Sequence, residues 1–161
     1  MIRKALAGAP DETVVLAAIG PMCTLAALVE SKPDAISPLS GCELIRQKVK
    51  RTVVMAGCFA EQWPGKVLDD NGQTQAEWNV KLDIPAAQKV CEMWPGELVF
   101  CSFEIGMELI TGARMEQEGY PWNPVGFCFH TWHQNGRSQQ VGRESWDPAT
   151  VLYAIQPDNG L

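Results

Sequence analysis

A polar stretch ahead of a predicted helix holds the side chains best suited to chemistry. Asn71, Glu77 and Asn79 bring one carboxylate and two carboxamides into this short segment. These groups accept and donate hydrogen bonds, so together they could bind the vicinal hydroxyls of a sugar. The alternative is a surface loop that only caps the following helix, and residue types alone favour it. Asp83 fits the N-cap of that helix, and Pro85 is tolerated in its first turn.

Three apolar runs are typical of strands, and helical patterns lie between them. The strands are predicted over Thr13–Ile19, Arg51–Ala56 and Glu97–Ser102. The first run is continuous and β-branched, which predicts a strand buried on both faces. Helices are predicted over Met22–Glu30, Glu43–Lys48, Ile84–Met93, Pro124–His133 and Asp147–Ile155. The strand–helix–strand order predicts an α/β fold, with a mostly parallel sheet flanked by helices and a right-handed crossover.

The segments that follow the strands matter because ligand sites in parallel sheets gather at the carboxyl ends of strands. Ile19–Pro21, Met55–Gly57 and Ser102–Glu104 fall at these ends. The polar stretch follows the second strand, which favours the sugar-binding interpretation. The remaining predictions are a long loop over residues 58–76, a helical turn over Phe103–Leu109, a loop over Thr111–Asn123, and Ser145 or Asp147 as the cap of the last helix.

Composition narrows the class of protein. The chain has 161 residues, of which 46% are hydrophobic and 20% charged, and this suits one globular domain. A net charge of −6 argues against nucleic acid as a partner, because phosphate binding needs clustered Lys and Arg. No run reaches the roughly 18 apolar residues of a membrane span, so no membrane partner is expected. The N-terminus is too weakly apolar for a signal peptide.

The cysteines do not form a metal or disulfide pattern. They include no Cys-x-x-Cys pair and no His at ligand spacing, so a zinc site or a disulfide framework is not expected. The six are Cys23, Cys42, Cys58, Cys91, Cys101 and Cys128. Free cysteines suit a reducing compartment, which makes a cytoplasmic location the expectation.

Short motifs in collinear order cover nearly the whole chain. They are Ile19-Gly20-Pro21-Met22-Cys23-Thr24-Leu25-Ala26, Val53-Val54-Met55-Ala56-Gly57, Ala76-Glu77-Trp78-Asn79, Asp83-Ile84-Pro85-Ala86-Ala87, and Ser145-Trp146-Asp147 with Thr150-Val151-Leu152-Tyr153. Together they resemble the inosine-uridine preferring nucleoside hydrolases, in a branch with Glu-Trp-Asn and Ser-Trp-Asp motifs. The resemblance implies a Rossmann-like fold, here a partial one, and hydrolysis of the N-glycosidic bond of ribonucleosides to ribose and free base, a step of purine and pyrimidine salvage.

The resemblance also implies roles for individual residues. The implied substrate contacts are Asn71, Glu77 and Asn79, which would hydrogen-bond the ribose, and Met55, which would lie against the sugar. In that family a calcium ion binds the attacking water and two ribose hydroxyls. Asp147 would be a calcium ligand through its carboxylate and Ile19 through its main-chain carbonyl, and both are oxygen donors that calcium accepts. The transition state is expected to resemble a ribosyl oxocarbenium ion.

The chain departs from the family pattern at the metal and at the leaving group. The family's N-terminal aspartate cluster, which supplies most calcium ligands and the general base, has no counterpart, because Asp11 stands alone before the first strand. We therefore expect a single, incomplete domain, an internal fragment or shortened homologue whose general base lies upstream of Met1. Trp146 stands where many members have a histidine that protonates the leaving base, and tryptophan cannot transfer that proton.

Other side chains have a functional and a structural interpretation. His130 and His133 could be paired metal ligands, although core or surface histidines are more common, and Glu104 could be an acid near the pocket. Three tryptophans could stack on a nucleobase or serve as packing: Trp63, Trp122 and Trp132.

Three hypotheses stay open at this point. In the first hypothesis, the parent protein is a calcium-dependent nucleoside N-ribohydrolase. This chain is then its ribose-binding half and is inactive in isolation. Alternatively, the chain is a degenerate, non-catalytic module that binds ribose or a nucleoside, or it is a structural interaction domain. A missing strand would leave an unpaired sheet edge, so we also expect self-association as a homo-oligomer or a partner segment that covers the edge.

Overall fold

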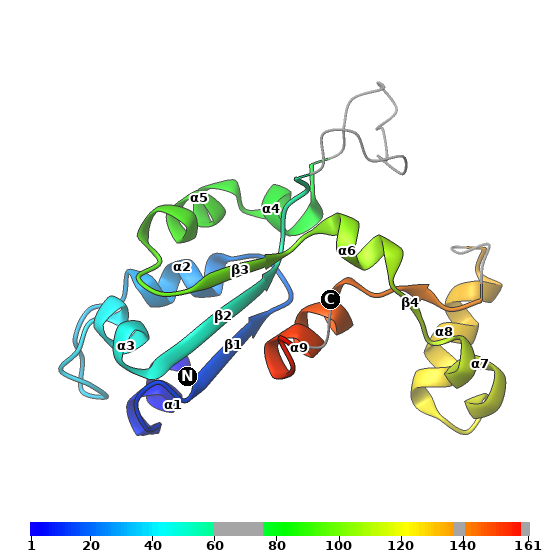
Figure 1. Cartoon of the computed structure of the whole chain (residues 1–161), viewed down its shortest axis with the longest axis horizontal. Helices are drawn as coiled ribbons and strands as arrows, with labels where there is room; N and C mark the ends of the chain where they lie inside the picture. The colour runs from blue at the N-terminus through cyan, green and yellow to red at the C-terminus, as the bar shows by residue number, and fades with distance from the viewer. Residues whose placement is uncertain (60–75, 137–140, 159–161) are drawn as a thin grey trace.

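The computed structural model describes residues 1–59, 76–136 and 141–158, which form an α/β structure around a three-stranded parallel sheet (Figure 1). The strands are β1 (Val14–Ala18), β2 (Val49–Met55) and β3 (Leu98–Cys101), in the order β1-β2-β3. In register, Ala18 of β1 lies opposite Val54 of β2, which in turn lies opposite Phe100 of β3. The predicted fold class is confirmed.

Helices connect and flank these strands. In the described residues they are α1 (Ile2–Gly8), α2 (Cys23–Val29), α3 (Gly41–Lys48), α4 (Trp78–Leu82), α5 (Ile84–Met93), α6 (Phe103–Glu108), α7 (Ala113–Gly119), α8 (Pro124–Gln134) and α9 (Trp146–Ile155). Every helix predicted from the sequence has a counterpart among them. The predicted cap of α5 is also confirmed, since Asp83 Oδ1 accepts a hydrogen bond from the Ala86 N–H at 3.1 Å.

β2 is the centre of the core, because successive side chains of a strand point to opposite faces of the sheet. Val54 packs in one cluster with Leu25 of α2 and Val90 of α5. Its neighbour Val53 packs in another cluster with Ala154 of α9. Helices from distant parts of the chain therefore cover both faces of the central strand, and they fix the position of its carboxyl end.

β1 lies at one edge of the sheet and is not buried on both faces, contrary to the prediction. Within the described residues it pairs with β2 alone, and its side chains alternate between half-buried and exposed. Val15 is 39% exposed, and Ile19 just beyond the strand is 47% exposed. The β-branched run correctly indicated a strand, but burial depends on what packs against that strand.

Arg3 fastens α1 to the loop that precedes α3. Its guanidinium donates to both carboxylate oxygens of Asp34, at 3.0 and 2.9 Å, and to Ser31 Oγ at 3.0 Å. The hydrogen bond from Arg3 is the main reason that the pKa of Asp34 falls to about 2. The sequence pattern did not indicate α1, which is short and begins without a side-chain cap.

The described residues between β4 and β5 form an excursion that lies away from the sheet. β4 (Ile110–Thr111) and β5 (Arg143–Glu144) pair antiparallel at the base of this excursion, and α7 and α8 lie beyond them, away from the sheet (Figure 1). The predicted loop over Thr111–Asn123 is wrong, because α7 occupies Ala113–Gly119. The polar sequence of α7 shows no apolar stripe that would have indicated a helix.

The structure also describes the cysteines and the length and polarity of the helices. All six cysteines are free thiols, and Cys101 alone among them is buried. Within the described part of the chain, each helix is too short or too polar to cross a lipid bilayer.

Candidate functional site

The carboxyl ends of β2 and β3 lie side by side, and the end of β2 contacts α4. A backbone hydrogen bond of 2.8 Å from Phe103 N–H to the Gly57 carbonyl joins the segments that follow β3 and β2. Gly57 has a positive φ of 83°, a conformation that glycine adopts without strain. The two segments can therefore cross closely at this point, which brings residues of α4, α6 and α9 toward one region.

Glu77 is the buried carboxylate of this region, with 7% of its surface exposed. Its Oε1 accepts from the Asn79 N–H at 2.8 Å, and its Oε2 accepts from the N–H groups of Val80 at 3.0 Å and Gly57 at 3.1 Å. Glu77 therefore caps α4 and also ties that helix to the end of β2. Asn79, which the sequence analysis placed in a polar stretch ahead of the helix, lies instead in the short helix α4, which begins at Trp78.

Asn79 is held against the last residue of β2. Its Nδ2 donates to the Met55 carbonyl at 2.9 Å and lies 3.2 Å from the Met55 sulfur. Met55 itself is buried. Three of the predicted substrate contacts, Glu77, Asn79 and Met55, are thus brought together by direct hydrogen bonds. Asn71, the fourth, lies outside the described residues.

Asp147 lies in the first turn of α9 and shares this electrostatic environment. Partial burial raises the pKa of its carboxyl, the positive charge of Arg143 lowers it, and the negative charge of Glu77 raises it further. The structure therefore places Asp147 within electrostatic reach of Glu77, although the two come from distant parts of the sequence. Ser145, one of the two predicted caps, is the N-cap residue of α9, but its side chain makes no capping hydrogen bond.

Trp146 is fixed in place by the segment that follows β3. Its indole Nε1 donates to the Phe103 carbonyl at 2.9 Å, and its ring stacks on the Phe103 ring with centroids 5.4 Å apart. A side chain at Gly106 would overlap the indole, so α6 and α9 approach closely only because this residue is glycine. The indole N–H is thus committed to the protein backbone.

The described residues offer few donors for calcium. Calcium takes about six to eight oxygen ligands in proteins. Within the described ranges, no group of three or more His, Cys, Asp or Glu residues is placed to hold a metal ion. Asp147 and the main-chain carbonyl of Ile19 could supply two oxygens, which is too few for a calcium site made by this part of the chain alone.

His130 and His133 pair with a buried carboxylate away from the strand ends. Their Nδ1 atoms lie 3.5 and 3.1 Å from Glu116 Oε1 of α7, and the Tyr120 ring stacks on His130. This arrangement accounts for both histidines by contacts between α7 and α8. It agrees with their structural interpretation rather than with metal binding.

Arg143, Gly57 and Phe103 take part in the site but were not among the predicted site residues. The Arg143 guanidinium lies 3.7 Å from the Trp132 ring centroid and 5.9 Å from that of Trp146. An arginine in the polar segment before α9 resembles any surface cation, so the sequence offered no local signal. Its contacts are long-range, because Trp132 belongs to α8 and Trp146 to α9.

The fold and this site define an α/β protein whose polar groups gather at the carboxyl ends of parallel strands. The family model described as "Inosine-uridine preferring nucleoside hydrolase" matches residues 1–160. The chain therefore belongs to the inosine-uridine preferring nucleoside hydrolase family.

The chain is also similar to individual curated proteins. The chain is 29% identical over 160 residues to the non-specific ribonucleoside hydrolase RihC of Escherichia coli (strain SMS-3-5), covering 98% of this chain and 46% of that protein. It is 27% identical over 154 residues to an uncharacterized protein of Schizosaccharomyces pombe, covering 91% of this chain and 44% of that protein. The chain thus spans about half the length of the curated relatives it matches.

Proposed function

We propose that the protein carrying this chain hydrolyses the N-glycosidic bond of ribonucleosides, and that Glu77 and Asn79 hold the ribose. The observation that carries the proposal is the position of Glu77. A buried carboxylate stands at the carboxyl end of β2, fixed by three backbone N–H groups and within electrostatic reach of Asp147. Membership of the family and the activity for which the bacterial relative is named support the reaction class.

The chemistry of these side chains suits a sugar with neighbouring hydroxyls. The Asn79 amide nitrogen donates to the Met55 carbonyl. The other polar atom of the amide, Oδ1, is an acceptor and can receive a hydrogen bond from a ribose hydroxyl. A carboxylate has about four lone-pair sites, and within the described part of the chain Glu77 uses three of them on backbone donors. One hydroxyl contact to Glu77 is therefore compatible with the cap that it forms.

These residues would act by binding and orientation. Hydrogen bonds to the ribose hydroxyls that strengthen as positive charge develops on the sugar favour the transition state over the bound substrate. Held rigidly by backbone contacts, Glu77 and Asn79 need little reorganisation as that charge forms. Calcium, when bound by Asp147 together with donors outside the described residues, would supply an activated water.

The test is ribose release by the protein that carries this chain, supplied with inosine or uridine in the presence of calcium. Release of ribose and free base from either nucleoside supports the proposal. No turnover with either substrate would contradict it.

The second candidate is a binding module without catalysis, and the contacts of Glu77 give it a specific reason. Capping α4 and tying it to Gly57 already explain a buried carboxylate, with no reaction required. Calorimetry distinguishes the two functions. Ribose binding that is indifferent to calcium, without turnover, favours the binding module. If no ribose binding is detected, or if the binding does not depend on Asn79, a structural domain is favoured.

A further inference from the structure

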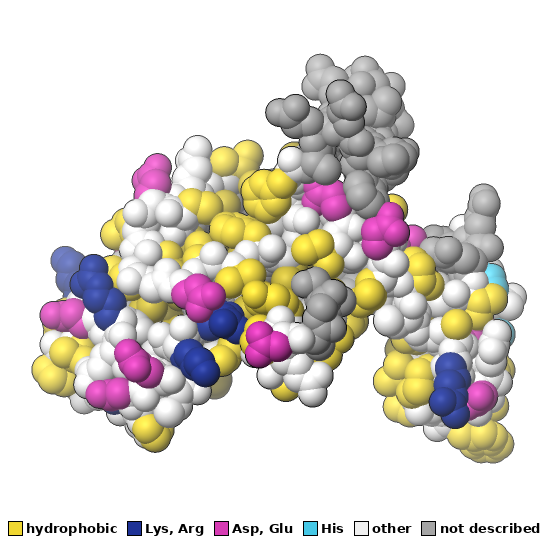
Figure 2. All heavy atoms as spheres, viewed as in Figure 1, with side chains coloured by type: hydrophobic (Ala, Val, Ile, Leu, Met, Phe, Trp, Pro, Cys, Tyr) yellow, Lys and Arg dark blue, Asp and Glu magenta, His cyan; other side chains and the backbone are white. Residues whose placement is uncertain are grey.

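One face of α8 lies closely against α7. Gly126, His130 and His133 are spaced four and three residues apart, so they form one stripe along the helix. A side chain at Gly126 would overlap the Met115 carbonyl oxygen of α7, so the two helices can approach this closely because the residue is glycine. The approach brings both imidazoles to Glu116 of α7. Figure 2 shows histidine side chains at the edge of this part of the molecule.

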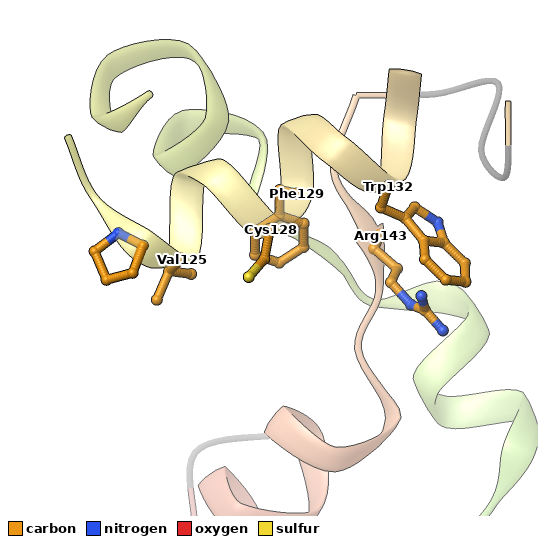
Figure 3. A pocket seen from close by; sticks show the side chains of 6 residues that line it. Val125, Cys128, Phe129, Trp132 and Arg143 are labelled. Carbon is orange, nitrogen blue, oxygen red and sulfur yellow. The ribbon is translucent and has the colours of Figure 1, made fainter. Parts of the chain in front are cut away.

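A different stripe of α8 borders a cavity of about 440 Å³. Figure 3 shows its labelled residues, Val125, Cys128, Phe129 and Trp132, with the Arg143 side chain of β5 beside Trp132. Neither histidine is among the residues that line this cavity. The two imidazoles therefore serve the contact with α7.

Glu116 is a buried carboxylate, with 8% of the residue exposed. Its Oε1 lies 3.1 Å from His133 Nδ1 and 3.5 Å from His130 Nδ1. Among the described residues, these imidazoles are the only basic groups at ion-pair distance from Glu116, and its Oε2 is buried without a hydrogen-bond partner. Burying a charged carboxylate costs free energy unless a partner compensates its charge. The cluster therefore favours a state in which one imidazole is positively charged.

The other titratable groups on the packed elements do not compensate Glu116 in the described structure. They are Arg114 and Glu118 of α7, Tyr120, Cys128 of α8, and Arg143 and Glu144 of β5. Arg114 pairs with Glu118 at 2.8 Å, and both side chains are mostly exposed. The Arg143 guanidinium lies 3.7 Å from the centroid of the Trp132 ring. The two imidazoles are thus the groups that can bring a positive charge to Glu116.

Two further contacts favour a charged imidazole. The Tyr120 ring stacks on the His130 ring with centroids 3.9 Å apart, and an aromatic face attracts a cation. His133 lies in the last turn of α8, where the helix dipole attracts positive charge. An ionised carboxylate only accepts hydrogen bonds, so His133 Nδ1 carries the hydrogen of its bond to Glu116. An additional proton then goes to Nε2, and the hydrogen bond is kept.

We propose that Glu116, His130 and His133 form a pH-sensitive switch: uptake of one proton by the imidazole pair holds α7 against α8, and loss of that proton loosens the two helices. This inference does not depend on the proposed function. An imidazole ordinarily changes its charge between about pH 5 and pH 8. Because the carboxylate favours the charged imidazole only while the helices are packed, the stabilisation is present near about pH 5.5 and is lost as the pH rises toward about 8.

The test is amide hydrogen exchange in the protein that carries this chain, with a chelator present to remove metal ions. Protection factors, which correct for the intrinsic effect of pH on exchange, are compared at about pH 5.5 and about pH 8, the two sides of the imidazole range. We expect amides of α7 and α8 to lose protection about 10-fold at the higher pH, the scale of one hydrogen bond to a charged group. Amides of β2 should keep their protection, because that strand lies in the core away from the cluster.

Glu116→Gln keeps the size of the side chain and an acceptor but removes the negative charge, so the loss of protection at the higher pH should disappear. Glu118→Gln is the matched control, since it removes an exposed carboxylate from the same helix, and it should keep the pH dependence of wild type. His133→Gln should also reduce the dependence. It decides the question if Glu116→Gln does not fold.

Equal protection of α7 and α8 at both pH values in wild type would overturn the proposal. A pH dependence that persists in Glu116→Gln, or undiminished in His133→Gln, would overturn it too, because another group would then be responsible. A dependence that appears only without the chelator would assign the cluster to a metal ion, which also overturns the switch.

Discussion

Glu77 Oε2 accepts a hydrogen bond from the Gly57 backbone N–H at 3.1 Å, which ties the first turn of α4 to the carboxyl end of β2. The same carboxylate caps α4 through the N–H groups of Asn79 and Val80. One buried side chain therefore connects the central strand to the helix that presents Asn79. This connection makes the candidate ribose site rigid. It also means that Glu77 contributes to the free energy of unfolding.

Replacing Glu77 with Gln should destabilise the protein by about 1–3 kcal/mol. An amide N–H₂ would then face a buried backbone N–H, and one donor would lose its acceptor. Denaturant unfolding measures the change. Asp83→Asn is the matched control, since an asparagine still caps α5, and we expect a change of only a few tenths of a kcal/mol. Equal stabilities of Glu77→Gln and wild type would contradict the role of Glu77 as a cap.

Gly106→Ala should destabilise the packing of α6 on α9. The added Cβ would overlap the Trp146 indole and its backbone, so the helices must separate, at a cost of about 1–3 kcal/mol. Gly8→Ala is the control, because a Cβ at Gly8 would meet no heavy atom within 4 Å. Thermal unfolding should show a lower Tm for the first variant and an unchanged or slightly higher Tm for the second. A tolerated Gly106→Ala would mean that Trp146 is not held where the structure places it.

Asp34→Asn should remove part of the dependence of stability on acid pH. The folded pKa of Asp34, about 2, lies below the roughly 3.9 of an unperturbed aspartate, so ionised Asp34 favours the folded state. This contribution is present above about pH 4 and is lost as the pH falls toward 2. Urea unfolding at several pH values measures it. Glu92→Gln, at an exposed carboxylate of α5, should leave the acid dependence unchanged. If the free energy of unfolding changes with pH in the same way in Asp34→Asn and in wild type, the contact with Arg3 does not contribute to the acid dependence.

Asp147→Asn should stabilise the protein at neutral pH while abolishing nucleoside hydrolysis. Because partial burial raises the folded pKa of Asp147, its ionised form disfavours folding. That penalty appears as the pH rises from the unfolded pKa through the folded pKa, and it is absent below both. The variant should therefore gain stability relative to wild type at pH 7 and show no gain at pH 3. Retained hydrolysis in the variant would contradict the proposed metal-binding role.

The sequence predicted the parallel sheet from local patterns, and the family resemblance assigned Glu77, Asn79 and Met55 to one ligand, in keeping with the contacts between them in the structure. It did not predict that Glu77 bonds Gly57, since this contact depends on how two segments cross in space. Arg143 was missed for the same reason, because its partners Trp132 and Trp146 belong to different helices. The helix α7 was missed because a polar helix is stabilised by what packs on it rather than by an apolar stripe in its own sequence.

Ribose binding by Asn79 is tested most directly by kcat/KM for inosine in Asn79→Ala, compared with Asp83→Ala, in the protein that carries this chain. Both variants lose a polar contact near α4, so Asp83→Ala controls for stability. We expect a loss of at least about 100-fold for Asn79→Ala, because a hydroxyl contact that strengthens in the transition state is removed, and a change of less than about 3-fold for Asp83→Ala. Equal activities of Asn79→Ala and wild type would contradict the assignment of ribose binding to this site.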